Sequence, residues 1–206
     1  MNIMAYKENY PSELLSTAVE AISSLPGVGR RSALRLALHL LRQSPERVHH
    51  ITDSINNLRD NVCYCSRCRM ISDSEICSIC SDTKRDQGTI CVVESVRDVM
   101  SIEATGQYHG VYHVLGGIIS PIAGTGPSDL TISELTARVP QAREVILALP
   151  GDVEGETTAF YIYRQIESSG VLVSSLARGL GFGDALEYAD SLTLGRSIVN
   201  RQIFKP

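Results

Sequence analysis

The stretch Cys65-Ser-Arg-Cys68-Arg-Met-Ile-Ser-Asp-Ser-Glu-Ile-Cys77-Ser-Ile-Cys80 contains two Cys-x-x-Cys pairs separated by eight residues. Two such pairs can bring four sulfur atoms around one tetrahedral ion, and zinc in structural sites is commonly held by four thiolates. No coordination position then remains for a reactive water, so the ion is expected to stabilise the fold. The spacing therefore predicts one structural Zn²⁺ per chain, bound by Cys65, Cys68, Cys77 and Cys80.

Disulfide bonds, or buried cysteines acting as small apolar residues, are the alternative interpretation of this spacing. The sequence begins without the basic start and long apolar run of a secretory signal, so we expect it in the cytoplasm, where disulfides are rare. Cys63 could replace Cys65 only by forming a less regular pair with Cys68. Cys91 stands in an apolar run and is expected in the core.

The charge of the chain is unevenly distributed. Its 206 residues are 43% hydrophobic, and no apolar stretch is long enough to span a membrane, so no membrane partner is expected. The net charge of −4 divides into +1 for residues 1–60, +1 for 61–85 and −6 for 86–206. A contact with a polyanion is therefore expected in the N-terminal part. Because tryptophan is absent, base stacking is not expected to be the main mode of nucleic-acid binding.

The N-terminal part has the pattern of three helices. Apolar residues recur every three or four positions in residues 11–24, in residues 30–43, and from Val48 to Val62. The first two helices are joined by Leu25-Pro-Gly-Val-Gly29. The residues of the second helix that we expect to face the core are Leu34, Ala37, Leu38 and Leu41.

The turn at residues 25–29 resembles the hairpin of helix–hairpin–helix DNA-binding modules. Gly27 and Gly29 have no side chain, so the backbone N–H groups that open the next helix can approach a phosphate, helped by the helix dipole. Phosphate contacts carry no sequence information. An ordinary tight turn between two core helices is the alternative. The residues expected to bind DNA are Gly27, Gly29, Arg30, Arg31 and Arg35.

Four apolar runs rich in β-branched residues follow the cysteine pairs, and each predicts a strand; the first, which ends in Glu94, is typical of a buried parallel strand. They are Thr89–Val93, Val111–Leu115, Glu144–Leu149 and Val171–Leu176. Helices are expected between them, one capped by Ser95 with Asp98, and the alternation predicts an α/β fold with a parallel sheet. The glycine-rich segment 116–127 matches no phosphate-binding motif and is expected to be a surface loop that faces a ligand or a neighbouring subunit.

Acidic residues follow two of these strands. Glu94 ends the first, and Asp152, Glu154 and Glu156 follow the third. Parallel sheets place their sites at the carboxyl ends of strands, so we expect these acids to converge. The arrangement resembles the Toprim domain of topoisomerases, primases and some nucleases, which carries a Glu after its first strand and an Asp-x-Asp after a later one. Clustered carboxylates of this kind either bind Mg²⁺ or repel one another.

The second motif departs from the Toprim pattern at one position. Pro150 stands where the first Asp is expected, and proline cannot ligate a metal. Because metal-assisted chemistry on a phosphodiester requires the full set of carboxylates, no catalytic residues are expected. Binding of Mg²⁺ through Glu94 and Asp152 stays open.

The order of these parts along the chain is more specific than any one of them. Together they resemble the RecR family of bacterial recombination mediators over essentially the full length, although Asn200 stands where that family usually has a glycine. The expected organisation is a helix–hairpin–helix domain at 1–60, a four-cysteine zinc finger at 61–85, a Toprim α/β domain at 86–176, and a tail for packing or oligomerisation at 177–206.

The resemblance implies a protein of recombinational DNA repair that is not an enzyme. Members of the family form ring-like tetramers, can encircle DNA, and work with RecO and RecF at gaps to load RecA on gapped or single-stranded DNA. By resemblance, the carboxylates at Glu94, Asp152, Glu154 and Glu156 would serve docking to RecO, and the protein would be found in the cytoplasm with the nucleoid.

Two other classes of function remain as alternatives. The first is a Mg²⁺-dependent Toprim enzyme of the nuclease, topoisomerase or primase type, which Pro150 disfavours. The second is an RNA-binding zinc protein, which the shortage of aromatic stacking residues disfavours.

Overall fold

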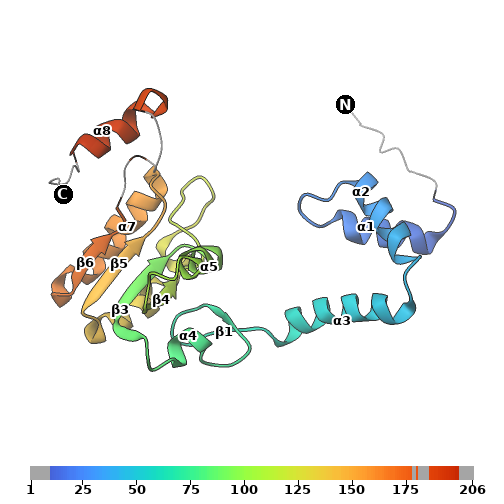
Figure 1. The fold of residues 1–206 in the computed structure, drawn as a ribbon, viewed down its shortest axis with the longest axis horizontal. Helices are drawn as coiled ribbons and strands as arrows, with labels where there is room; N and C mark the ends of the chain where they lie inside the picture. The colour runs from blue at the N-terminus through green and yellow to red at the C-terminus, as the bar shows by residue number, and fades with distance from the viewer. Residues whose placement is uncertain (1–9, 178–179, 181–185, 200–206) are drawn as a thin grey trace. The chain divides into compact units, whose positions relative to one another are not determined.

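The computed structural model describes residues 10–177, 180 and 186–199. The chain divides into two compact units, Met1–Asn61 and Val62–Pro206, which are described separately below (Figure 1). Part of the tail expected at 177–206, including Asn200, lies outside the described residues.

The N-terminal unit contains the three helices that the sequence predicts. They are α1 (Glu13–Ser23), α2 (Arg30–Leu40) and α3 (Pro45–Asn61). Helix α1 packs on α2 around three buried residues, Val19, Ala33 and Ala37. The small alanines, four residues apart on α2, allow the two helices to approach closely.

The predicted inward face of α2 is wrong at two positions. Leu38 is 41% exposed and Leu41 is 73% exposed. Because Ala33 and Ala37 make the contact with α1, these leucines lie to one side of the helix pair. Together with Leu14 they line an apolar groove of about 810 Å³ within the N-terminal unit.

The second unit is built on a four-stranded parallel sheet in the order β4-β3-β5-β6, which confirms the predicted α/β class. The strands are β3 (Asp86–Val93), β4 (Gly110–Val114), β5 (Glu144–Ala148) and β6 (Leu172–Ser175). The remaining elements are β1 (Cys63–Tyr64), β2 (Ile71–Ser72), α4 (Ser78–Ser81), α5 (Val96–Ala104), α6 (Ile132–Arg138), α7 (Val153–Ile166) and α8 (Ser191–Val199), with 3-10 turns at Pro127–Asp129, Val139–Gln141, Glu167–Ser169 and Leu186–Tyr188.

The two faces of the sheet are covered by different elements. Alternate residues of a strand point to opposite faces, so Ile90 and Val92 of β3 pack with α6 and α7. Cys91 and Val93 point the other way and pack with Val99 of α5. Cys91 is 2% exposed, which confirms its predicted place in the core.

Strand β4 lies at one edge of the sheet, and four of its outward-facing backbone groups have partners from other segments. Arg85 donates a hydrogen bond to Gly110 O at 3.0 Å, and Arg138 donates to Tyr112 O at 2.7 Å. Val114 N–H donates to Cys68 O at 2.9 Å, and Val114 O accepts from Thr131 Oγ1 at 2.8 Å. The cysteine-rich segment and two arginines therefore close an edge that would otherwise be open to another strand.

The cysteine-rich segment forms a small module on this edge. Strands β1 and β2 pair antiparallel and α4 follows them. Met70 and Ile79 pack against the cluster around Tyr112 and Val114, on the same face of the sheet as α5. In the part of the chain that the structure describes, no helix has the length and apolar character needed to cross a membrane.

Candidate metal centre, DNA hairpin and carboxylate site

The four predicted metal ligands lie together in the cysteine module. Cys65, Cys68, Cys77 and Cys80 are buried, and their sulfur atoms all lie within 4.8 Å of one another. The Cys68 and Cys77 sulfurs are 3.5 Å apart, which is too far for a disulfide and fits two ligands of one ion at Zn–S distances of about 2.3 Å. Among the described residues, this is the one group of three or more such side chains that converges. The donor set therefore suits zinc.

Tight turns of the backbone aim these sulfurs inward. Arg69 adopts a left-handed conformation with φ 63°, and its N–H donates to Cys65 O at 3.0 Å. Cys77 N–H donates to Cys65 Sγ at 3.4 Å. Burial by itself raises the pKa of Cys65, but N–H groups of Cys77, Cys68 and Arg67 outweigh it and lower the pKa to about 6. At Cys65 the backbone therefore favours the thiolate form, which is the form that binds metal. The neighbouring Cys80 thiol and burial raise the pKa of Cys68, and burial raises the pKa of Cys77 to about 11.

Cys63 lies outside this group. Its sulfur donates to Ser72 O and Ser74 O, both at 3.2 Å, so it joins β1 to β2 and the turn that follows.

The hairpin between α1 and α2 has the open backbone that a phosphate contact needs. Gly27 has φ +79°, a conformation that glycine adopts at little cost. Gly29 is the N-cap of α2 and offers no side chain to the first N–H groups of that helix, which have no partner within the helix itself. A Cβ atom at Gly27 or Gly29 would meet nothing within 4 Å.

Arginines surround the start of α2. Arg30, Arg31 and Arg35 are all exposed, as a phosphate contact requires. Arg31 and Arg35 share a shallow cleft of about 390 Å³ with Arg42. The residues expected to bind DNA did not include Arg42, which follows the C-cap of α2 and reaches the cleft from the turn beyond that helix.

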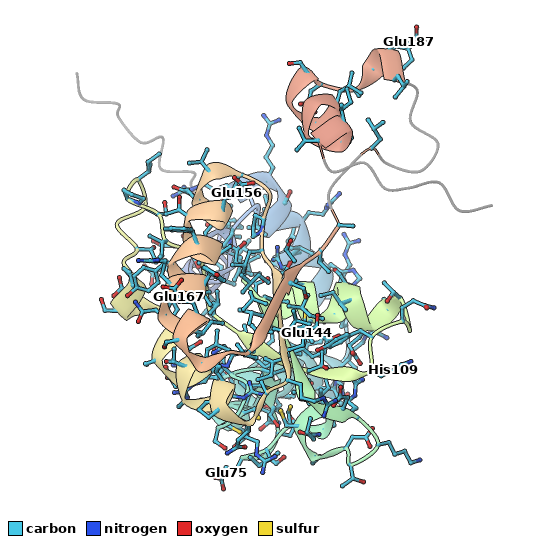
Figure 2. All side chains as sticks on the ribbon, turned by 90° about the vertical axis from the view of Figure 1, so that its left-hand side faces the viewer. Glu75, His109, Glu144, Glu156, Glu167 and Glu187 are labelled. Carbon is cyan, nitrogen blue, oxygen red and sulfur yellow. The ribbon has the colours of Figure 1, made fainter. Side chains whose placement is uncertain are left out.

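The predicted convergence of the carboxylates is wrong at the scale of a metal site: among the described residues, no three of them bring their oxygens together, and several hold the structure instead. Asp152 caps α7, because its Oδ1 accepts a hydrogen bond from Gly155 N–H at 2.8 Å. Glu154 Oε1 accepts from Ser120 Oγ at 2.6 Å and so anchors the loop at 116–127. Glu156 lies in the first turn of the same helix, and Glu167 follows its last residue (Figure 2).

Glu94 follows β3, and the negative charges of its acidic neighbours affect its pKa. Burial raises its pKa, and the charges of Asp98 and Asp152 raise it further. Asp98 is also engaged locally, because its Oδ2 accepts from Ser95 N–H at 2.7 Å at the start of α5. This confirms the predicted cap of that helix.

Gly155 is required by the turn that carries these acids. A Cβ atom there would lie 2.3 Å from the carbonyl oxygen of Pro150 and 2.9 Å from its carbonyl carbon. The sequence Glu154-Gly155-Glu156 therefore needs its glycine, because the first turn of α7 packs against the backbone of Pro150.

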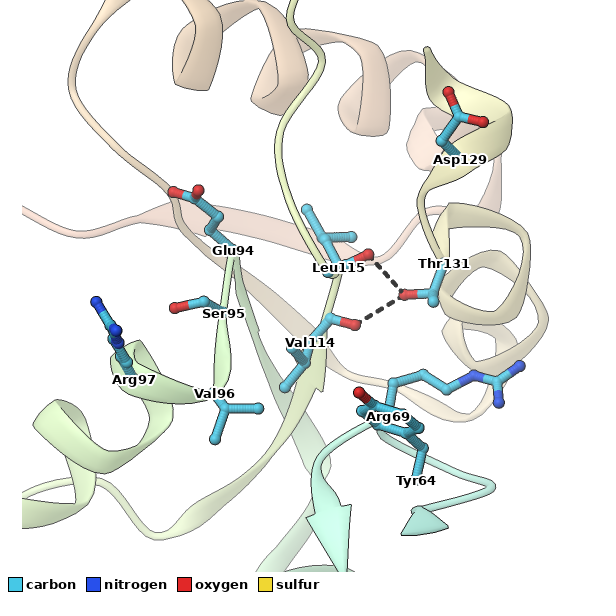
Figure 3. A pocket seen from close by; sticks show the side chains of 11 residues that line it. Tyr64, Arg69, Glu94, Ser95, Val96, Arg97, Val114, Leu115, Asp129 and Thr131 are labelled. Carbon is cyan, nitrogen blue, oxygen red and sulfur yellow. Dashed lines mark hydrogen bonds between the residues drawn. The ribbon is translucent and has the colours of Figure 1, made fainter. Parts of the chain in front are cut away.

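A pocket of about 690 Å³ lies beside Glu94, within the second unit. Glu94 and Arg97 lie on one side of it, and Tyr64 and Arg69 of the cysteine module lie on the other (Figure 3). Sequence reasoning missed Tyr64, Arg69 and Arg97. No sequence signal joins them, because they meet only where the module packs on β4.

The glycine-rich segment 116–127 is an ordered loop at the surface. Ser120 pairs with Thr125 through two backbone hydrogen bonds of 2.9 and 3.0 Å, and Ile119 N–H donates to Thr158 Oγ1 of α7. Ile122 is 96% exposed. The loop therefore presents an apolar side chain from a base that is held by α7.

Comparison with known protein families agrees with this architecture. A model described as "Toprim domain" matches residues 88–177, and the chain is a Toprim-domain protein with a four-cysteine module suited to zinc. Three further models describe the helix-hairpin-helix, the four-cysteine zinc finger domain and the C-terminal part of RecR, and they match residues 15–59, 62–82 and 179–202. The chain belongs to the RecR family.

Relatives support this membership over nearly the full length. A protein named "Recombination protein RecR" from Porphyromonas gingivalis is 55% identical over 199 residues, which cover 96% of each chain. The protein of that name from Bacteroides thetaiotaomicron is 56% identical over 96% of this chain and 97% of its own. The one from Flavobacterium johnsoniae is 51% identical over 95% of this chain and 96% of its own.

Proposed function

We propose that this protein is a non-enzymatic recombination mediator that binds DNA through its hairpin and helps load RecA on gapped or single-stranded DNA with RecO and RecF. The observation that carries the proposal is the uncapped start of α2, where Gly29 leaves the first N–H groups exposed beside Arg30 and Arg31. Such contacts would hold double-stranded, single-stranded or gapped DNA without reading its sequence.

Replacing Gly29 with valine is expected to weaken DNA binding by about tenfold or more, because the new side chain would stand between the phosphate and the helix N-terminus. Since a Cβ at Gly29 meets nothing within 4 Å, the fold is expected to be kept. The measurement is fluorescence anisotropy with two duplexes of unrelated sequence at fixed salt, with circular dichroism as the test of folding.

Gly126→Val is the matched control, because a Cβ there meets no atom closer than 3.6 Å and the residue lies far from the hairpin in sequence. It should bind DNA as the unaltered protein does. Unchanged affinity in a folded Gly29→Val variant would show that the hairpin does not contact DNA.

The apolar groove of the N-terminal unit supports assembly of several chains. Leu14 is 85% exposed and Leu41 is 73% exposed, and exposed apolar patches of this kind commonly mark protein interfaces. We propose that the oligomer is a tetrameric ring. Its subunits would contact one another through their N-terminal units and through the tail at 177–206. Four hairpins in one ring would gain avidity for DNA from weak single contacts.

The acidic site would serve docking of RecO through Glu94, Asp152, Glu154 and Glu156. The negative charge of residues 86–206 supports an orientation away from DNA and toward basic partner surfaces. Asp152 and Glu154 each accept a hydrogen bond within the domain, which supports a role in holding the fold rather than in chemistry. The proposal therefore includes no Mg²⁺ bound at Glu94 and Asp152. Membership of a DNA-repair family supports a location at the nucleoid in the cytoplasm.

The protein is expected to retard supercoiled and gapped plasmid in a gel without nicking or relaxing it, in Mg²⁺ and in EDTA alike. The physical reason is that Pro150 stands where a metal-binding Asp is needed. Mg²⁺-dependent cleavage or relaxation that disappears in a Glu94→Gln variant would show instead that the protein is a Toprim enzyme.

A further inference from the structure

A buried network on β4 contains a cation that the proposed function does not use. Arg138, the last residue of α6, donates to Tyr112 O at 2.7 Å and lies 3.1 Å from His113 Nδ1. A guanidinium can only donate, so Nδ1 of His113 accepts and Nε2 carries the proton, 2.8 Å from Thr131 O. Burial lowers the pKa of His113 to about 4. His113 is therefore neutral near pH 7, and Arg138 is the charged member of the network.

The same stretch of β4 holds the cysteine module. Val114, two residues beyond Tyr112, donates its N–H to Cys68 O at 2.9 Å. Burial lowers the pKa of Arg138, whereas the sulfurs of Cys80, Cys68 and Cys65 act in the opposite direction, as anionic groups near a cation do. Arg138 and the cysteine module thus bind the same outward edge of β4, at Tyr112 O and Val114 N–H, two residues apart.

The metal centre needs a counter-charge. Four thiolates around Zn²⁺ carry a net charge of −2, and a buried charge is costly unless an opposite charge lies near it. The module has two arginines between its cysteines, but Arg67 is exposed and Arg69 forms an ion pair with Glu134 at 2.5 Å. We propose that Arg138 is a positioning residue of the metal centre, which supplies from the Toprim side the positive charge that strengthens zinc binding by the four cysteines.

The test measures zinc affinity of the full chain by competition with a chromophoric chelator at fixed pH and salt. Arg138→Gln keeps a donor for Tyr112 O but removes the charge, and it is expected to weaken zinc binding by about 10- to 100-fold, as is usual for groups that support metal ligands. Arg138→Lys keeps the charge and should bind zinc much more tightly than Arg138→Gln. The rate of zinc release should be lowest in the unaltered protein, higher in Arg138→Lys and highest in Arg138→Gln.

Arg67→Gln is the matched control, because it removes an exposed charge from the module itself, and it should change the affinity by no more than about fivefold. Circular dichroism at saturating zinc reports whether each variant is folded. Wild-type affinity in a folded Arg138→Gln variant, or equal losses in the Gln and Lys variants, would overturn the proposal. If Arg138→Gln fails to fold, the zinc affinity of Arg138→Lys decides. An affinity near that of the unaltered protein supports the role of the charge, and a loss of about 10-fold or more overturns it.

Discussion

Replacing Cys77 with serine is expected to release the metal and to unfold residues 62–82, while the helices of the N-terminal unit stay folded. The cluster inside the module consists of the four cysteines, with Met70, Ile76 and Ile79 at its margin. Two strands of two residues and a helix of four residues cannot be stable alone. Zinc binding to small modules supplies about 10–16 kcal/mol of apparent free energy at pH 7, so the metal decides whether this segment folds.

Cys63→Ser is the control for this prediction. Its thiol donates to Ser72 O and Ser74 O and lies outside the four-cysteine group, so the variant is expected to keep one zinc per chain. Metal content and hydrogen exchange over residues 62–82 are the measurements. Full metal content with intact protection in Cys77→Ser, or equal metal loss in Cys63→Ser, would contradict the assignment of the ligands. Treatment with a strong chelator should reproduce the exchange pattern of Cys77→Ser.

Gly155→Ala is expected to destabilise the Toprim sheet by about 1–3 kcal/mol, which corresponds to several degrees in the melting temperature. The added methyl group would lie 2.3 Å from the carbonyl oxygen of Pro150, and that atom belongs to the backbone, so it cannot turn aside as a side chain can. The first turn of α7 would have to move, and with it the cap made by Asp152. Thermal unfolding and hydrogen exchange at residues 150–158 would detect this movement.

Gly195→Ala provides the matched comparison. Gly195 also lies within a helix, α8, but a Cβ there meets nothing within 4 Å. Alanine is favoured over glycine in helices by about 1 kcal/mol, so this variant should be unchanged or slightly more stable. If Gly155→Ala melted like Gly195→Ala, the close packing of α7 on Pro150 would not limit the choice of residue at this position.

Helices and strands whose own apolar residues repeat at a regular spacing were predicted correctly from the sequence. The alternation of apolar runs and helices was enough to predict the parallel sheet, because strands that alternate with helices of this length require crossover connections. The start of β3 was missed: the prediction began at Thr89, whereas the strand begins at Asp86. Those first residues are polar, and the pairing of β3 with β4 is irregular between Asp86 and Ile90, so no apolar signal marks them.

Features that depend on packing between elements were not predicted. Leu38 and Leu41 have the spacing of a core face, yet a single chain leaves them exposed, because periodicity shows that a face is apolar and not what covers it. The metal ligands could be read from spacing alone. Arg138 lies 58 residues after Cys80, and only the fold brings it to the module.

The closed edge of β4 has a consequence for newly made chains. Val114 N–H is paired by a carbonyl of the metal-dependent module, so a chain that has not yet acquired zinc would leave part of this edge without its cover. Uncovered strand edges template association between chains. The supply of zinc during synthesis would therefore govern how much of the protein reaches a soluble form, and chains made under zinc shortage would be expected to engage chaperones or be degraded before they ever meet DNA.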